Sequence, residues 1–363
     1  MPYSLALALA AFVATLALTR AVMALAHRAG ALDHPGPRHV HAAPTPTMGG
    51  LGFAAAVIAL AWIARALPGP ARELDARPLV GWTLATIPVL FLGVVDDLRG
   101  TGPWTKLLVQ ACAALVLVQF GYGVPVLTNP FGAPIASGAF SVPLTVAWVL
   151  LVVNAINLID GLDGLAAGAV LIASASLWWV ARMHADLYVM YFASLLIGAT
   201  AGFLRWNFPP ARVFMGDTGS QFLGLTLAAA SLLENRKGTA AVTLLFPLVA
   251  MAVPIADSVL AFVRRVWLKR PVFRGDTEHI HHRLVRLGLS HRGALFVLWY
   301  VCAYFAVMAV ILAALPRGYV LLLVLVLGAG LLFALEMLEV FDRHARAARG
   351  ADADEAERSA AGR

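Results

Sequence analysis

The chain has 363 residues, of which 61% are hydrophobic and only 13% are charged, and its mean hydropathy is +0.81. Soluble globular domains carry about 25% charged residues, so this composition excludes one and predicts a membrane protein. The formal net charge of +7 does not require a nucleic-acid partner, because cytoplasmic loops of membrane proteins are enriched in Lys and Arg. Cys112 and Cys302 lie in apolar runs, which excludes a disulfide framework or a cysteine-rich metal site.

Eleven segments are apolar over enough residues to cross a bilayer as helices. They lie at about 3–26, 48–66, 79–97, 104–121, 142–159, 165–181, 187–204, 217–233, 239–264, 293–314 and 319–341. We therefore predict an all-α integral membrane protein with one polytopic domain over residues 1–342. Basic residues rather than a cleavage site follow the first segment, so we expect that helix to be retained. Residues 343–363 should form a charged tail that is disordered or extends the last helix.

The distribution of Lys and Arg predicts the orientation of these segments. Alternate loops place 19 of the 27 basic residues on one side of the membrane and seven on the other, and Arg20 lies within the first segment. The side with the excess is expected to be cytoplasmic. With an odd number of crossings, the N-terminus would face outside and the tail would face the cytoplasm.

The most unusual polar segment is NAINLIDGLDG at 154–164, where Asn154, Asn157, Asp160 and Asp163 follow one another at steps of three. A carboxylate in or beside a bilayer is costly unless it faces a polar cavity, a partner or a metal. An ordinary turn between helices explains one or two of these residues but not their spacing. Steps of three drift by about 60° around a helix, and the glycines that follow predict that the helix ends or bends here.

Carboxylates also lie at two other helix ends on the cytoplasmic side. Asp96 and Asp97 end the third segment, where they oppose the helix dipole and call for a cation, supplied by a metal, Lys106 or Arg99. Asp217 opens the eighth segment, where a carboxylate can also serve as a simple N-cap.

Two cytoplasmic loops and one intramembrane carboxylate complete the polar features. Residues 33–50 are dense in turn formers, which suits a rigid linker as well as a functional loop. The last loop carries three histidines within residues 279–282, followed by Arg283. It could bind a transition metal, lie on lipid head groups, or clamp a phosphate, and we favour the phosphate clamp. Asp257, in the ninth segment, is a lesser site candidate.

Together these groups indicate a reaction class. Carboxylates without thiolates prefer a hard cation, and Mg²⁺ typically takes one or two carboxylates plus substrate phosphates. Basic residues around such an ion would hold further phosphate, as in phosphoryl transfer. A site at the membrane face further suggests one lipid substrate and one soluble nucleotide.

Four motifs in order resemble the polyprenyl-phosphate N-acetylhexosamine-1-phosphate transferases, the MraY/WecA superfamily: VDD at 95–97, the segment 154–164, FMGD at 214–217 and HIHH at 279–282. The histidine loop and the pattern over 38–50 look more like the WecA/TagO/WbpL branch than like MraY. The resemblance implies transfer of an N-acetylhexosamine 1-phosphate from a UDP-sugar, UDP-GlcNAc or a derivative, to undecaprenyl phosphate. The products would be an undecaprenyl-diphospho-sugar and UMP, in the first membrane step of a cell-envelope glycan.

The same resemblance implies roles for individual residues. Asp217 looks like the principal ligand of Mg²⁺, which Mn²⁺ could replace, with Asp97 beside it. Asp96 resembles the proposed base on the lipid phosphate, and Lys106 should face the phosphates. Gly100 stands where some members carry a third charge. The nucleotide and sugar pocket would comprise Asn157, Asp160, Asp163, Phe214, His279, His281, His282, Arg283 and Thr45. Within this set, Phe214 resembles a ring stacked on uracil. Secondary candidates are Asn154, Asn207, Arg38 and His41.

The resemblance places the protein in the bacterial cytoplasmic (inner) membrane and allows a homodimer. Within the same class, the alternative is an MraY-like phospho-MurNAc-pentapeptide transferase. A different class, an ion-coupled transporter, also needs intramembrane Asp and Asn residues. It is disfavoured because the Asn-x-x-Asn-x-x-Asp pattern is not repeated and the charges gather at one face.

Overall fold

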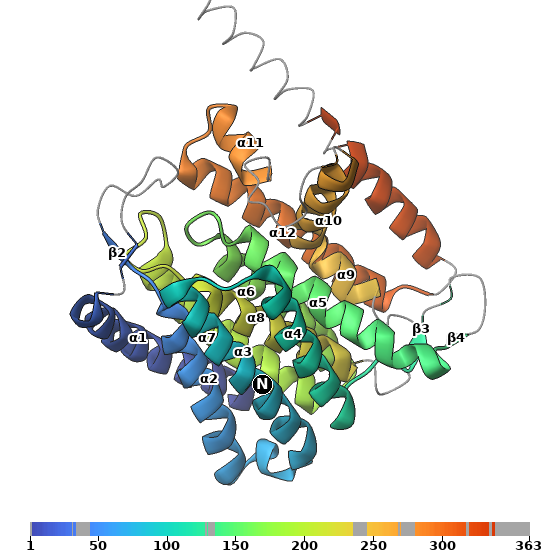
Figure 1. The fold of residues 1–363 in the computed structure, drawn as a ribbon. Coiled ribbons are helices and arrows are strands. Elements are labelled where there is room, and N and C mark those ends of the chain that lie inside the picture. The colour runs from blue at the N-terminus through green and yellow to red at the C-terminus, as the bar shows by residue number, and fades with distance from the viewer. Residues whose placement is uncertain are drawn as a thin grey trace, which may run out of the picture.

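The computed structural model of the chain describes residues 2–30, 32–33, 44–127, 129, 135–234, 245–267, 269, 280–316, 319–333 and 336–337. Over these residues the fold is a bundle of α-helices with short hairpins in two of its loops (Figure 1). The labelled helices are α1 (Pro2–Ala29), α2 (Gly49–Ala66), α3 (Ala76–Arg99), α4 (Pro103–Gln119), α5 (Ser141–Ile159), α6 (Leu165–Met183), α7 (Leu187–Asn207), α8 (Gly216–Glu234), α9 (Leu245–Ala250), α10 (Ala252–Trp267), α11 (Ile280–Arg286) and α12 (His291–Ala314).

The remaining elements are short, apart from one last helix over Tyr319–Phe333. Strand β1 (Leu32–Asp33) pairs antiparallel with β2 (Thr45–Pro46), and β3 (Val126–Leu127) pairs with β4 (Ile135–Ala136). Single 3₁₀ turns, η1 (Pro70–Glu73) and η2 (Gly138–Phe140), precede α3 and α5.

The prediction of an all-α integral membrane protein is confirmed. Among the described residues, seven helices are long and apolar enough to cross a membrane, and Pro103–Gln119 and Tyr319–Phe333 are shorter apolar helices. The seven are Pro2–Arg28, Gly49–Ala66, Ala76–Arg99, Gly138–Ile159, Leu165–Met183, Leu187–Asn207 and His291–Ala314.

The predicted ninth segment, 239–264, differs from a single helix. Its described part is broken at Met251, between α9 and α10. Pro254 explains the position of the break, because a proline has no N–H to donate to the carbonyl of Ala250 four residues earlier. The predicted tail, 343–363, lies outside the described residues.

Helix α8 lies at the centre of the bundle and packs against α2, α3, α5 and α7 (Figure 1). It is the most polar of the predicted segments at its start, yet most of its side chains are fully buried. Gly50 of α2 lies against Gly219 of α8, where a Cβ on Gly50 would overlap the Gly219 backbone. Small residues of this kind let membrane helices pack backbone to backbone. The start of α8 is thereby held against the start of α2.

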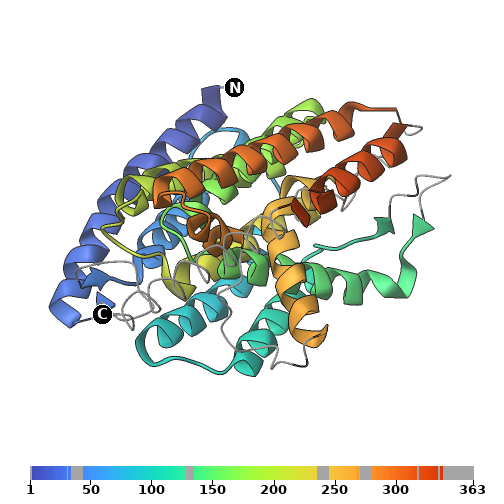
Figure 2. The ribbon, with the colours of Figure 1, turned by 90° about the horizontal axis from the view of Figure 1, so that it is seen from above.

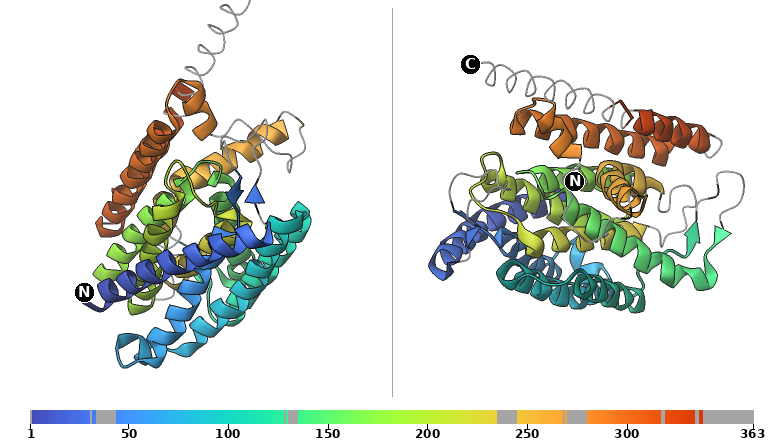
Figure 3. Two further views of the ribbon diagram at one scale, coloured as in Figure 1. Left: turned by 90° about the vertical axis from the view of Figure 1, so that its left-hand side faces the viewer. Right: turned by 45° about the horizontal axis from the view of Figure 1, so that its top comes forward.

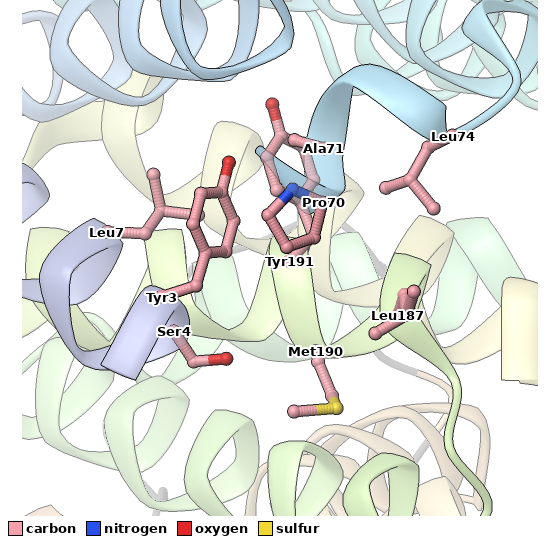
Figure 4. A pocket seen from close by; sticks show the side chains of 9 residues that line it. All are labelled: Tyr3, Ser4, Leu7, Pro70, Ala71, Leu74, Leu187, Met190 and Tyr191. Atoms are coloured by element: carbon pink, nitrogen blue, oxygen red, sulfur yellow. The ribbon is translucent and has the colours of Figure 1, made fainter. Parts of the chain in front are cut away.

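Alternating helix directions bring the ends of α3, α5 and α7 to the same end of the bundle as the beginnings of α2, α4, α6 and α8. Helix α12 packs on α6, α9 and α10 at one side of the bundle (Figure 2, Figure 3). At the end of the bundle opposite the beginnings of α2, α4, α6 and α8, a small pocket is enclosed by α1, η1 and α7. It is lined by residues such as Tyr3, Pro70 and Tyr191 (Figure 4). That pocket has no carboxylate or histidine in its lining, so we assign no chemistry to it.

Candidate active site

Three carboxylates meet where the end of α3 lies against the start of α8. Asp96 and Asp97 come from the last turn of α3, and Asp217 comes from the first turn of α8. All three are partly buried, and each offers an oxygen that lies within 4.8 Å of the others. A set of carboxylate oxygens without sulfur or imidazole donors fits a hard divalent cation such as Mg²⁺. The cluster is therefore a candidate metal centre.

Lys106, in the first turn of α4, is the cation that balances part of this charge. Its Nζ lies 2.8 Å from Oδ2 of Asp96 and 2.5 Å from Oδ2 of Asp217. The lysine side chain is 23% exposed, so it is partly open to solvent at this end of the bundle. Three carboxylates against this one ammonium leave the cluster with excess negative charge, which favours binding of a further cation.

Asp97 holds the start of α8 in place. Its Oδ1 accepts from the N–H of Asp217 at 2.7 Å, and its Oδ2 accepts from the N–H of Thr218 at 3.2 Å and its hydroxyl at 2.6 Å. It thus satisfies free donors in the first turn of α8, as an N-cap does, although it belongs to another helix. Gly216 makes room for it, with φ of 71° and no space for a Cβ beside the Asp97 carboxylate.

Asp96 faces the turn between α3 and α4 instead. Its Oδ1 accepts from the N–H of Thr101 at 2.7 Å and from the Thr101 hydroxyl at 2.5 Å, while Oδ2 pairs with Lys106. The two neighbouring aspartates therefore hold different elements, Asp97 the start of α8 and Asp96 the start of α4.

The segment 154–164 ends α5 at Ile159, as its glycines predicted, and its two asparagines contact two different helices. Nδ2 of Asn154 donates to Oε1 of Gln110 on α4 at 2.7 Å. Nδ2 of Asn157, one turn nearer the end of α5, donates to the Ser220 hydroxyl on α8 at 2.9 Å. Asn157 thus lies beside the first turn of α8, close to the carboxylates.

The two aspartates of this segment lie in the turn after α5. Burial raises the pKa of Asp160 well above its usual range, and the negative charges of Asp217, Asp97 and Asp163 raise it further. Asp163 accepts from the backbone N–H of Ala211 at 2.9 Å, which fixes the loop between α7 and α8. The structure therefore brings Asp160 into the field of the cluster, whereas Asp163 supports a neighbouring loop.

That loop is also fixed by Asn207, the last residue of α7. Asn207 is buried, and its Oδ1 accepts from the N–H of Gly164 while its Nδ2 donates to the carbonyl of Val213, both at 2.9 Å. Both ends of the amide are thus used within the protein. This secondary candidate connects the loop after α5 to the loop before α8.

Phe214 and Thr45 lie where the loop between α1 and α2 meets the start of α8. The Phe214 N–H donates to the carbonyl of Pro46 at 2.9 Å, and the Phe214 carbonyl accepts from the N–H of Gly49. The Phe214 side chain is partly buried, and Thr45 is buried in β2, next to Pro46. Stacking of the Phe214 ring on uracil stays a prediction.

Helix α11 carries the part of the histidine loop that the structure describes. His282 and Arg283 lie on α11 and are partly buried. Asp257, only 5% exposed, accepts from the N–H of Ile280 at 3.0 Å and so ties the start of α11 to α10. This lesser candidate therefore anchors the helix. The predicted residues His279, Arg38 and His41, together with the His281 side chain, lie outside what the structure describes.

Several polar residues of the site were not singled out from the sequence. Thr101 and Thr218 supply hydroxyls to the two adjacent aspartates, and two glutamines lie beside them within the bundle. For Gln110 and Gln221 a signal was present, because an amide inside an apolar segment needs a buried polar partner.

Comparisons with known proteins agree with this geometry. A family model described as Glycosyl transferase family 4 matches residues 79–235, which run from α3 to the end of α8 and carry all three carboxylates and Lys106. A Bacillus subtilis (strain 168) protein named "Probable undecaprenyl-phosphate N-acetylglucosaminyl 1-phosphate transferase" is 35% identical over 302 residues, covering 82% of this chain and 81% of the relative. This chain belongs to glycosyl transferase family 4. The predicted resemblance to the superfamily is thereby confirmed.

Two further relatives show the range of this family. The "Decaprenyl-phosphate N-acetylglucosaminephosphotransferase" of Mycobacterium tuberculosis (strain ATCC 25618 / H37Rv) is 37% identical over 316 residues, 80% of this chain and 78% of that protein. The "Phospho-N-acetylmuramoyl-pentapeptide-transferase" of Desulforudis audaxviator (strain MP104C) is 33% identical over 332 residues, 82% of this chain and 94% of that protein. The protein is thus a multi-pass membrane transferase of this family.

Proposed function

We propose that the protein transfers N-acetylglucosamine 1-phosphate from UDP-GlcNAc to undecaprenyl phosphate, forming a lipid-linked diphosphosugar and UMP. The observation that carries this proposal is the carboxylate cluster with Lys106 at one end of a membrane-spanning bundle. The names of the Bacillus and Mycobacterium relatives support GlcNAc as the sugar and a polyprenyl phosphate as the acceptor.

Asp217 and Asp97 are the residues we propose to hold Mg²⁺, or Mn²⁺ in its place. Asp217 is the better placed, because its hydrogen bonds use Oδ2 and no donor among the described residues reaches Oδ1. Asp97 already accepts from three donors, so its contribution combines metal binding with the support of α8. When bound, the cation would neutralise the negative charge of the diphosphate and of the departing UMP.

Lys106 and Asp96 are proposed to receive the lipid phosphate. An oxygen of that phosphate attacks the phosphorus next to the sugar, and the bond from this phosphorus to the oxygen of UMP breaks. The second pKa of a phosphate monoester is near 6, so the nucleophile is mostly dianionic at neutral pH. Asp96 is assigned as the base for the protonated fraction, and Lys106, once drawn to the phosphates, stabilises the added charge as a point cation. Direct in-line attack needs no covalent intermediate on an aspartate.

The nucleotide and sugar are proposed to lie between the loop after α5 and the loop before α8. Asn157 and Asp160 border this region, Phe214 would stack on the uracil ring, and His282 and Arg283 on α11 would hold the diphosphate. This end of the bundle is assigned to the cytoplasm, with the N-terminus outside, because the loops here carry most of the Lys and Arg residues. We place the protein in the inner membrane. The homodimer stays a prediction.

The test is UMP release by detergent-solubilised protein supplied with undecaprenyl phosphate, Mg²⁺ and a panel of UDP-sugars. We expect release with UDP-GlcNAc that EDTA abolishes, and no release by Asp217→Asn, which should still be recovered folded. Release only with UDP-MurNAc-pentapeptide would favour the alternative indicated by the Desulforudis relative. No release from any of these donors would refute the proposed reaction, whereas membership of the family would stand.

A further inference from the structure

Three amide side chains, Asn154, Gln110 and Gln221, connect helices α4, α5 and α8 and end on the proposed metal ligand Asp217. Nε2 of Gln221 donates to Oδ2 of Asp217 at 2.9 Å, Nε2 of Gln110 donates to Oε1 of Gln221 at 3.2 Å, and Nδ2 of Asn154 donates to Oε1 of Gln110 at 2.7 Å. Gln221 and Gln110 are 0% and 1% exposed. We call these three residues the amide relay, and none of its glutamines has a role in the transfer proposed above.

The chemistry at both ends of the relay fixes the direction in which every amide points. The carboxylate of Asp217 can only accept, so Gln221 must present its NH₂ group to it and its oxygen to Gln110. At the other end, the carbonyl of Leu150 also only accepts, and Nδ2 of Asn154 donates to it at 2.8 Å. Asn154 must therefore direct the same NH₂ group to Gln110, and a flip of any amide would place two donors or two acceptors together.

Substrate binding can displace the Lys106 donor from Asp217, but it cannot displace the donor of the amide relay. Both groups donate to Oδ2 of Asp217, but Lys106 is partly exposed and can turn towards incoming phosphates. Gln221 is fully buried and held from behind by Gln110, so its donor stays in place. Hydrogen bonds to the outer oxygen of a metal-binding carboxylate orient the carboxylate, and their loss typically weakens metal binding.

We propose that Gln221 and Gln110 are positioning residues that hold the Asp217 carboxylate with Oδ1 directed at the divalent cation; the inference rests on the proposed function. A role in packing alone would not need amides, since two fully buried amides between membrane helices contribute little more than apolar side chains would. The relay instead links the orientation of one carboxylate to three helices that form the walls of the site.

The experiment is a Mn²⁺ titration of the detergent-solubilised full chain without substrates. The readout is the shift in its apparent thermal unfolding midpoint at each Mn²⁺ concentration. Gln221→Met removes the donor to Asp217 and keeps the length of the side chain. We expect it to raise the half-saturating Mn²⁺ concentration about 10–100-fold, as loss of a hydrogen bond to a metal ligand generally does. Gln110→Met should shift the concentration less, in the same direction. The double variant should be no weaker than Gln221→Met alone, because both act through one contact.

Ser231→Ala is the matched control, because it removes another buried hydrogen bond of α8, from Nε1 of Trp148 to the Ser231 hydroxyl at 2.9 Å, away from the carboxylates. It should lower the midpoint without changing the Mn²⁺ concentration needed. A wild-type Mn²⁺ response in Gln221→Met, or independent additive shifts in the double variant, would overturn the relay. Should Gln221→Met not fold, Gln110→Met decides, because it leaves both contacts of Asp217 in place. Absence of UMP release from a wild-type protein that binds Mn²⁺ would instead refute only the proposed function.

Discussion

Asp96 and Asp97 are adjacent in the chain, yet replacing each by Asn should separate stability from catalysis. The Asp97 carboxylate accepts from three donors at the start of α8, at 2.6 to 3.2 Å. The Asp96 carboxylate accepts from Thr101 and pairs with Lys106. We expect both variants to lose most of their UMP release, but only Asp97→Asn to lose much stability.

The magnitudes follow from the geometry. Asn keeps one acceptor and turns the other oxygen into an NH₂ group, so in either orientation Asp97→Asn directs this NH₂ at an N–H of α8. An unsatisfied buried donor costs about 1–3 kcal/mol, and loss of a negative charge at a helix N-terminus adds about 0.3–1 kcal/mol. In Asp96→Asn, the remaining oxygen can keep both bonds from Thr101. The loss is then chiefly the ion pair to the partly exposed Lys106, about 1 kcal/mol or less.

The assay is the apparent thermal unfolding midpoint in detergent with EDTA, at one scan rate because unfolding of such proteins is commonly irreversible. A change of 1 kcal/mol shifts the midpoint by about 2–4 °C in domains of 150–250 residues, so Asp97→Asn should unfold several degrees below Asp96→Asn. Thr218→Val, which removes one hydroxyl donor and keeps the carboxylate, should lie between Asp97→Asn and wild type. Equal midpoints for the two Asn variants, or a less stable Asp96→Asn, would refute the assignment of Asp97 as the support of α8.

Three further outcomes are expected. Gly216→Ala should lose both stability and UMP release. Gly30 has a similar φ of 69° but open space around a Cβ, so Gly30→Ala should cost only the backbone strain of about 1–2 kcal/mol. Thermal unfolding midpoints of the two variants would show the difference. Asp257→Leu leaves the first N–H of α11 without its acceptor, so kcat/KM for UDP-GlcNAc should fall about tenfold, for a loss near 1.4 kcal/mol, with an unchanged Mg²⁺ requirement. Asp160→Asn should raise the thermal unfolding midpoint of the metal-free protein at pH 7, because the raised pKa of Asp160 means that its ionised form is unfavourable in the folded state. This gain over wild type should shrink as the pH falls, because the wild-type carboxyl then takes up its proton.

Much of the fold could be predicted because the length and apolar content of a segment decide whether it crosses a membrane. The described helices match the predicted segments, apart from the break between α9 and α10 and from the short helix α11, which lies in the predicted loop after the ninth segment. The signal for that break was present in Pro254, but a long apolar window conceals a single proline. Alternation of the segments then predicted that the polar loops share one face, and the meeting of Asp96, Asp97 and Asp217 agrees with it.

The division of roles within the cluster could not be predicted. Asp97 contacts α8 across 120 residues of chain, and local sequence does not say which of two adjacent carboxylates turns towards α8 and which towards Lys106. The helix end favours a cation near both, and only the packing of α3 on α8 separates them. Gln110 and Gln221 were missed for a related reason: each is one amide in an apolar stretch, and its partner belongs to another helix.

The segment 154–164 shows what a spacing of three accomplishes at the end of a membrane helix. Because each step of three turns the side chain by about 60° around the helix, consecutive polar residues can contact different neighbouring helices. Asn154 contacts α4 and Asn157 contacts α8, both while α5 is still helical. After the helix ends, Asp160 lies in the field of the cluster and Asp163 holds the loop before α8. One short segment thus connects α4, α8 and the loop before α8 around a single site.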